Sequence, residues 1–301
     1  MPELLVTYPA GSTAESSTVA AMMRVDGRAL FAVERTPCHP ESPRWPDQPE
    51  DRCMLEADGR GVPVEVREGY LLDGELVVGS AAAAGSAAAV SSPPEVLDTQ
   101  EDPTREAIPC VVHSVPTEFA PALGERVQLR VDESYRQALS RNHSRCHLVS
   151  LALNAALSEA WRKDPPARDS LGNPDFDKLA ITSSKIDEHG SLDSYRIGKH
   201  LRKSGFSIEA LSDPGALAQA VMDLAKGWLL SSPSVKVTPG ECPLQTRRTW
   251  TCELPHGAAS FPCGGTHPSA LEPDEGLDVK ISWDPEERRL QMRACSRTFH
   301  L

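Results

Sequence analysis

The amino-acid sequence has no apolar run of about 18 residues, the length that a membrane-spanning helix requires. Its first residues, 1–6, carry neither a basic segment nor an apolar core of signal-peptide length. We therefore expect a cytoplasmic protein without a membrane partner.

The sequence also lacks a cysteine framework and an excess of basic residues. Its eight cysteines are scattered through a long chain, so a reducing compartment would keep them as thiols or metal ligands rather than disulfides. The formal net charge of −12 argues against a protein that coats nucleic acid, because such binding neutralises many phosphates, and we expect no DNA partner. Local basic clusters could contact RNA or could be ordinary solvated surface: 199–203, Arg247 with Arg248, and Arg288 with Arg289, Arg293 and Arg297.

The first part of the chain has the pattern of a small β domain. A chain of 301 residues has room for about two domains. Short apolar or alternating segments separated by turns occupy residues 18–78, a pattern that favours β-strands. These segments are 29–33, 62–66 and 75–78.

The predicted β domain is interrupted and then resumes. Residues 79–107 are rich in Ala, Ser, Pro and acidic side chains and have no apolar period, which is typical of a mobile insertion. Strand-like sequence returns at 110–113 and 126–131. The first domain is therefore expected to cover residues 1–132.

The remainder, 133–301, is expected to be an α+β domain. Apolar residues at spacings of three and four predict a helix from Glu133 to about Arg162, which Pro165 and Pro166 would end. A second helix is expected at 217–230, opened by Asp213 and Pro214. The tail alternates like two paired strands, at 278–283 and 290–294.

Two short motifs offer ligands for a metal ion. His143 and His147 are four residues apart on the predicted helix, so both imidazoles project from one face. Cys263 and His267 are separated by two glycines and a threonine, and the glycines allow a tight turn. Sulfur and imidazole ligands together suit Zn²⁺.

Spacing alone leaves other readings open, because buried structural histidines and thiols would show the same pattern. Cys252 and His256 repeat the Cys-His spacing, although Pro255 and the absence of glycine make that pair the weaker chelator. Cys146 lies between the two helical histidines, and we expect it to be a packed small residue rather than a ligand.

The motifs resemble those of a known family. Residues 141–148, followed by Cys-Gly-Gly-Thr-His at 263–267, look like the editing domain of alanyl-tRNA synthetase and the freestanding AlaX proteins. Residues 34–41 are similar to the family's Thr-Pro-Phe-Tyr-Pro-Glu segment, and 124–132 fits the segment before its first metal motif. The resemblance covers most of the chain outside 79–107.

This resemblance implies a small β-barrel domain followed by an α+β catalytic domain. It implies hydrolysis of the ester that joins a wrong amino acid to tRNA, with aminoacyl-tRNA as partner and one Zn²⁺ held by His143, His147, Cys263 and His267. Serine is the family's usual mischarged amino acid. Threonine or a threonine-like analogue is the second candidate, motivated by departures from the pattern: residues 42–49 in place of a glycine-rich stretch, Pro268 in place of valine, and 190–196 without a counterpart.

The mechanism expected from this site is metal-assisted hydrolysis. Zn²⁺ would polarise the ester carbonyl or lower the pKa of a bound water, or it would orient the substrate's amino group. Four protein ligands are typical of structural zinc, so catalysis requires that one ligand, such as His267, is displaced or that the coordination shell expands. The absence of a carboxylate between the histidines separates the site from HExxH metalloproteases.

Two hydroxyl groups lie inside the motifs. Ser144 and Thr266 could bind the substrate or the attacking water, or could form only local hydrogen bonds in the helix and turn. Two other functions fit the same residues: a non-catalytic zinc module that binds tRNA or a synthetase, and a small-molecule ester or amide hydrolase.

Overall fold

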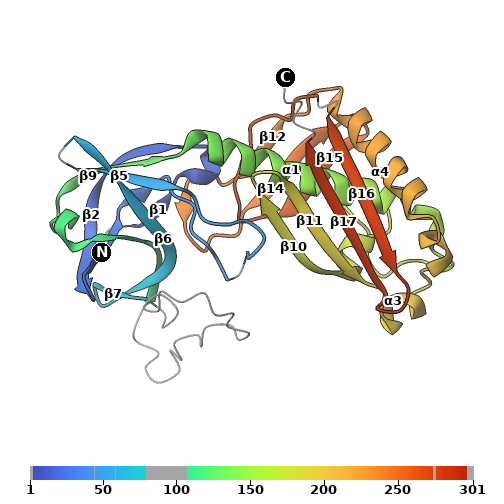
Figure 1. Ribbon diagram of the computed structural model, residues 1–301, viewed down its shortest axis with the longest axis horizontal. Helices are drawn as coiled ribbons and strands as arrows, with labels where there is room; N and C mark the ends of the chain where they lie inside the picture. Colours follow the sequence, from blue (N-terminus) through green and yellow to red (C-terminus); the bar gives the residue numbers. More distant parts are fainter. Residues whose placement is uncertain (1–2, 44, 58, 79–106, 274–275, 297–301) are drawn as a thin grey trace. The chain divides into compact units, whose positions relative to one another are not determined.

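The computed structural model describes residues 3–43, 45–57, 59–78, 107–273 and 276–296 (Figure 1). It shows a mixed α+β protein that is rich in strands and has few helices, so the predicted α+β class is confirmed. The predicted insertion at 79–107 lies outside the described residues, except for Ala107, which begins a strand.

The chain forms two compact units. The first contains Met1–Arg136, Thr238–Arg248 and Gly264–Thr266, and the second contains Gln137–Val237, Thr249–Cys263 and His267–Leu301. Each unit contains its own cluster of buried apolar side chains.

Antiparallel strands build the first unit. Six of them pair in a cycle, in the order β5, β9, β2, β3, β8 and β6 and back to β5, and β7 adds to β6. The cycle closes because the long strands β2 and β6 each pair with different neighbours at their two ends. The strands are β2 (Ala14–Val25), β3 (Arg28–Val33), β5 (Cys53–Ala57), β6 (Arg60–Leu72), β7 (Glu75–Val77), β8 (Ala107–Pro116) and β9 (Arg126–Val131).

Alternation along these strands fills the core of the first unit. Val62, Val64 and Val66 are buried at every second position of β6, and the residues between them are exposed. The strands predicted at 29–33, 62–66, 75–78, 110–113 and 126–131 are confirmed by β3, β6, β7, β8 and β9, although β6 and β8 extend well beyond the predicted ends.

A small second sheet joins distant parts of the chain within the first unit. β1 (Leu5–Val6) pairs in parallel with β4 (Arg35–Thr36) and antiparallel with β13 (Cys242–Pro243). The short 3-10 helices of this unit are Tyr8–Ala10 and Thr117–Phe119.

The second unit combines helices with two sheets. One sheet has the order β10-β11-β17-β16 and the other β12-β14-β15. Its strands are β10 (Ile181–Asp187), β11 (Gly190–Arg196), β12 (Val235–Thr238), β14 (Thr249–Leu254), β15 (Gly257–Pro262), β16 (Leu277–Asp284) and β17 (Arg289–Ser296). Its helices are α1 (Glu133–Ala156), α2 (Phe176–Ala180), α3 (Lys199–Lys203) and α4 (Pro214–Leu229), with 3-10 turns at Ser158–Ala160 and Ile208–Leu211.

The long helix α1 is confirmed but ends earlier than the prolines predict. It stops at Ala156, and a 3-10 turn leads into an extended Trp161 that pairs with Phe206. The apolar stripe of α1 is weak because the helix is buried on several faces and some of its buried residues are polar. Asn142, Ser144 and Arg145 are buried although they lie outside the predicted stripe. A helix that is buried on most sides needs no polar face, so the spacing of its apolar residues indicates less burial than the structure shows.

The other elements of the second unit agree with their sequence signals in part. α4 begins after Asp213, whose carboxylate accepts a hydrogen bond from the Ala216 backbone N–H at 2.9 Å, as expected for an N-cap. The two tail strands are confirmed as the antiparallel pair β16 and β17. Within the described part of the chain, no helix is long and apolar enough to cross a membrane.

The hairpin of β10 and β11 has no clear signal in the sequence. β11 covers 190–196 and pairs with β17, which begins about a hundred residues further along the chain. Gly190 is required where the strands meet, because a Cβ atom there would lie 2.1 Å from the Ala294 carbonyl oxygen.

Candidate metal centre

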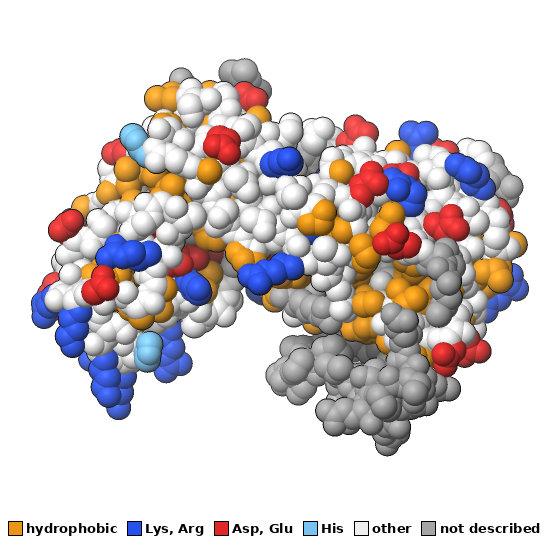
Figure 2. Space-filling model, turned by 180° about the vertical axis from the view of Figure 1, so that it is seen from behind, with side chains coloured by type: hydrophobic (Ala, Val, Ile, Leu, Met, Phe, Trp, Pro, Cys, Tyr) orange, Lys and Arg blue, Asp and Glu red, His pale blue; other side chains and the backbone are white. Residues whose placement is uncertain are grey.

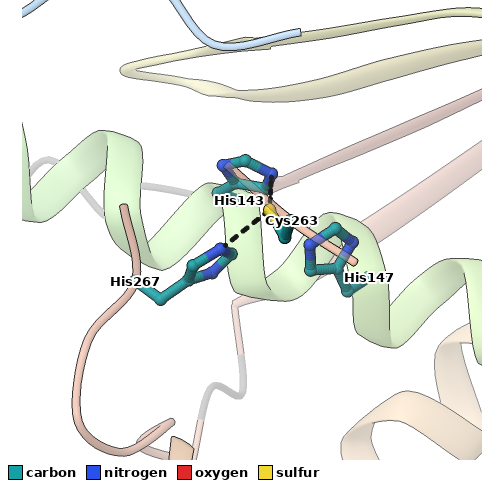
Figure 3. A group of neighbouring side chains, drawn as sticks. All are labelled: His143, His147, Cys263 and His267. Atoms are coloured by element: carbon teal, nitrogen blue, oxygen red, sulfur yellow. Dashed lines mark hydrogen bonds between the residues drawn. The ribbon is translucent and has the colours of Figure 1, made fainter. Parts of the chain in front are cut away.

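Four side chains of the second unit converge on one point (Figure 3). One nitrogen or sulfur atom from each of His143, His147, Cys263 and His267 lies within 4.8 Å of the others. The two histidines project from consecutive turns of α1, Cys263 follows β15, and His267 lies four residues later. The four residues predicted as metal ligands could therefore hold a metal ion together.

The two distances from the Cys263 sulfur to histidine nitrogens suit a tetrahedral site. Cys263 Sγ lies 3.4 Å from His143 Nε2 and 3.2 Å from His267 Nε2. With Zn–S and Zn–N bonds of ordinary length, the sulfur and nitrogen of a tetrahedral site are about 3.6 Å apart. The observed distances are within a few tenths of an ångström of that value.

The protonation of the donors also suits a metal. Burial raises the pKa of the Cys263 thiol, but the charges of His143, His267 and His147 outweigh it and hold the pKa well below its usual value. Burial lowers the pKa of His267 to about 3. A thiolate and a neutral imidazole are the forms in which cysteine and histidine bind metals, so the directions of these two pKa shifts favour metal binding by Cys263 and His267.

One donor atom has no hydrogen-bond partner among the described residues. His147 Nε2 is buried and unpaired, although its ring packs between aromatic side chains, stacked on Phe261 at 4.9 Å and tilted against Trp250 at 4.9 Å. A buried unpaired nitrogen costs free energy unless a ligand satisfies it. The buried, unpaired Nε2 of His147 is therefore consistent with a role as a metal ligand.

Ser144 lies behind the cluster and contacts His267. Its Oγ is 2.8 Å from His267 Nδ1 and accepts a hydrogen bond from Trp250 Nε1–H at 3.2 Å. Because His267 Nε2 faces Cys263, the proton of a neutral ring belongs on Nδ1, which then donates to Ser144. Ser144 thus orients His267 through its second nitrogen.

We expect Ser144→Ala to weaken metal binding about 10- to 100-fold, the usual effect of removing a group that orients a metal ligand. The variant leaves His267 Nδ1 and Trp250 Nε1 without their shared acceptor. The affinity is measured by competition with a chromogenic zinc chelator. Ser150→Ala is the control. Ser150 is also a buried serine of α1, but its side chain forms a hydrogen bond with Asp177 and not with a proposed metal ligand. Equal affinities for the two variants would contradict the role of Ser144.

The loop between Cys263 and His267 belongs to the first unit. Gln48 forms two hydrogen bonds with Thr266 of this loop. The side-chain N–H of Gln48 donates to Thr266 Oγ1 at 2.9 Å, and its side-chain carbonyl oxygen accepts from the Thr266 backbone N–H at 2.9 Å. Gly264 does not adopt a positive φ, and a Cβ atom at this position would lie 2.7 Å from the Trp45 ring. The first glycine of the motif therefore permits close packing rather than a left-handed turn.

The two other cysteines considered as possible ligands, Cys146 and Cys252, lie outside the four-residue group. Cys146 is buried, with Sγ 3.5 Å from both oxygens of Asp193, and is not part of the four-residue group, as predicted. Cys252 is buried within β14 and His256 is exposed in the turn before β15, so the second Cys-His pair is not part of the group either.

Sequence reasoning missed the residues that support the ligands. Trp250, Phe261 and Gln48 reach the site motifs across 106, 114 and 218 positions of sequence, respectively. No local pattern marks any of them. No protein-family model matches the chain, and none of the curated proteins matches it.

Proposed function

We propose that this protein is a zinc-dependent trans-editing hydrolase that cleaves the ester of a mischarged aminoacyl-tRNA. The observation that carries the proposal is the convergence of the residues of both motifs, His143 and His147 with Cys263 and His267, on one point. Ser-tRNA is the first substrate we propose, and a tRNA carrying threonine or a threonine-like analogue is the second.

The two units support this proposal. The first, with its cycle of six paired strands, would correspond to the small β-barrel domain of the alanyl-tRNA editing family. The second would be the α+β catalytic domain, since all four proposed ligands belong to it.

Zinc is the metal that we propose for the site, because one thiolate and three imidazoles form a donor set that it favours. When bound, zinc would polarise the ester carbonyl or activate a water molecule. Ser144 and Cys263 both contact His267, which favours its retention as a ligand over its displacement.

The test of this proposal is deacylation of purified tRNAs that carry Ser, Gly, Ala or Thr. We expect the wild-type protein to release one of these amino acids at least about 100 times faster than the uncatalysed reaction, as metal-assisted hydrolysis allows. Release should stop after chelation and return when zinc is added. Metal content is measured at each stage.

The alternative is a non-catalytic zinc module that binds tRNA or a synthetase, which the presence of four protein donors favours. Protein that holds one zinc ion and releases no amino acid from any of the four tRNAs would support this alternative and contradict the hydrolase. Hydrolysis of free amino-acid esters without release from tRNA would instead indicate a small-molecule hydrolase.

A further inference from the structure

The outer face of the sheet β10-β11-β17-β16 has an ordered pattern of charge. Strand pairing places Lys185 of β10, Leu192 of β11, Arg293 of β17 and Lys280 of β16 in one row across the sheet. The three cationic side chains of this row are exposed. With strands about 4.8 Å apart, the row extends for about 14 Å.

A second cationic row lies four residues further along the strands. Arg196 of β11 pairs with Arg289 of β17, and both are exposed. At about 3.4 Å per residue, the two rows are about 14 Å apart. The exposed Lys199, Arg202 and Lys203 of α3 follow Arg196 closely, and Lys and Arg side chains gather at this end of the second unit in Figure 2.

The row between the two cationic rows is uncharged and capable of hydrogen bonding. It consists of Ser183, Ser194, Gln291 and Ser282, one from each strand. Gln291 Nε2 donates a weak hydrogen bond to Ser194 Oγ at 3.4 Å, and the hydroxyl groups of Ser183 and Ser282 are on exposed residues.

The aromatic side chains of this sheet point the other way. Tyr195 is buried and Trp283 packs against the apolar core of the second unit, as do α1 and α4 (Figure 1). The outward rows described above contain no aromatic residue. Stacking of unpaired bases, the usual means of binding single strands, is therefore not available on them.

Acidic residues lie at the borders of this cationic face. Asp187 and Asp278 lie in the row beyond Lys185 and Lys280, and Asp284 pairs with Arg289 at the edge. Lys280 Nζ is 3.8 Å from Asp278, and Arg289 forms an ion pair with Glu287 at 2.8 Å. Phosphates would be favoured over the cationic rows and repelled beyond them.

We propose that this sheet face binds double-helical RNA, with phosphates over the two cationic rows and 2′-hydroxyl groups over the Ser and Gln row. The wide, shallow minor groove of an RNA duplex presents both groups together. This inference rests on the proposed function only in identifying the RNA, which would be the acceptor stem of the tRNA.

The test compares binding of three fluorescent probes: an acceptor-stem RNA hairpin, a DNA duplex of the same sequence and a single-stranded RNA. We expect the RNA hairpin to bind the wild-type protein at least about tenfold more tightly than either other probe, because only it offers ordered 2′-hydroxyl groups. Lys280→Glu/Arg293→Glu should weaken hairpin binding at least about tenfold and lower the slope of log K against log salt by about 2.

The control is Lys178→Glu/Lys236→Glu, which changes the net charge equally on exposed residues of α2 and β12. This variant should bind the hairpin within about twofold of wild type, since it leaves both rows intact. Ser183→Ala/Ser282→Ala should lower the preference for RNA over DNA at least about threefold without changing the salt slope. Thermal unfolding of each variant confirms that it is folded.

The outcomes separate this inference from the proposed function. Hairpin binding that is unchanged by Lys280→Glu/Arg293→Glu overturns the inference, even where the protein deacylates tRNA. Binding of all variants to anionic vesicles in preference to the hairpin also overturns it. Loss of hairpin binding in this variant, with hydrolysis of 2′(3′)-O-seryl-adenosine unchanged, supports both. A protein that hydrolyses no ester but binds the hairpin through these residues keeps the inference and contradicts the hydrolase.

Discussion

Cys263→Ala is expected to abolish metal binding and to lower deacylation at least about a thousandfold, which corresponds to about 4 kcal/mol at 1.36 kcal/mol for each factor of ten. Cys263 is the only sulfur donor in the four-residue group, and its sulfur contacts both His143 and His267. Without it, three imidazoles remain and the thiolate charge that balances a divalent ion is lost. Metal content by mass spectrometry and the rate of amino-acid release check the expectation.

Cys252→Ala is the matched control for this variant. Both cysteines are buried, both precede a histidine by four residues, and both substitutions remove the same side-chain volume. They differ in chemistry, since burial raises the pKa of Cys252 to about 12 and keeps it a neutral thiol. The Cys252 variant should retain its metal and its activity. A Cys263 variant that retains one zinc ion and full activity would refute the assignment of this cysteine as a ligand.

Asp51→Asn is expected to destabilise the first unit by about 3–5 kcal/mol, the usual cost of breaking a buried ion pair. Asp51 and Arg136 are both almost fully buried, and Arg136 Nε donates to Asp51 Oδ1 at 2.8 Å while Nη2 pairs with Oδ2. Burial alone would lower the pKa of Arg136, but the Asp51 carboxylate raises it above the ordinary value. The substitution leaves a buried guanidinium without its counter-charge.

The same carboxylate also holds a loop that reaches the metal motif. Asp51 accepts a hydrogen bond from the His39 N–H at 2.6 Å, and its own N–H donates to the His39 carbonyl at 3.0 Å. The loop closed by these bonds contains Gln48, which forms two hydrogen bonds with Thr266. Asp51→Asn should therefore loosen this contact as well as lower the free energy of unfolding.

Urea unfolding measures the effect, with Glu56→Gln as control. Glu56 pairs with Arg130 in the same unit, but both side chains are largely exposed, so its loss should cost less than about 1 kcal/mol. A urea midpoint for Asp51→Asn equal to that of Glu56→Gln would show that burial adds nothing to the Asp51–Arg136 pair.

Local periodicity was sufficient for helix α1 and for several strands, although not for the 12-residue strand β2, and the spacing of the ligand residues made them candidates. The spacing of His143 and His147 places both on one face of α1 wherever that helix packs, and three residues between Cys263 and His267 keep them within reach of one point. The apolar alternation of β9, β16 and β17 likewise identified these strands without any knowledge of their partners.

Strand pairing between distant segments was decided only in the folded chain. β11 pairs with β17 across about a hundred residues, and this pairing aligns Arg196 with Arg289 and Leu192 with Arg293. Neither strand's own pattern selects its partner or register, because an alternating strand can pair with any other of matching length. The cationic rows of the outer face therefore could not be read from the sequence.

The sequence by itself identified His143, His147, Cys263 and His267 as candidate ligands, because helical spacing and a short loop are local constraints and because the two motifs resemble those of a known family. Only the tertiary structure decided that Ser144 contacts His267 and that Gln48 forms hydrogen bonds with Thr266. Each of these depends on side chains brought together from distant segments, and the burial that sets the state of each thiol exists only once both sheets have packed on α1.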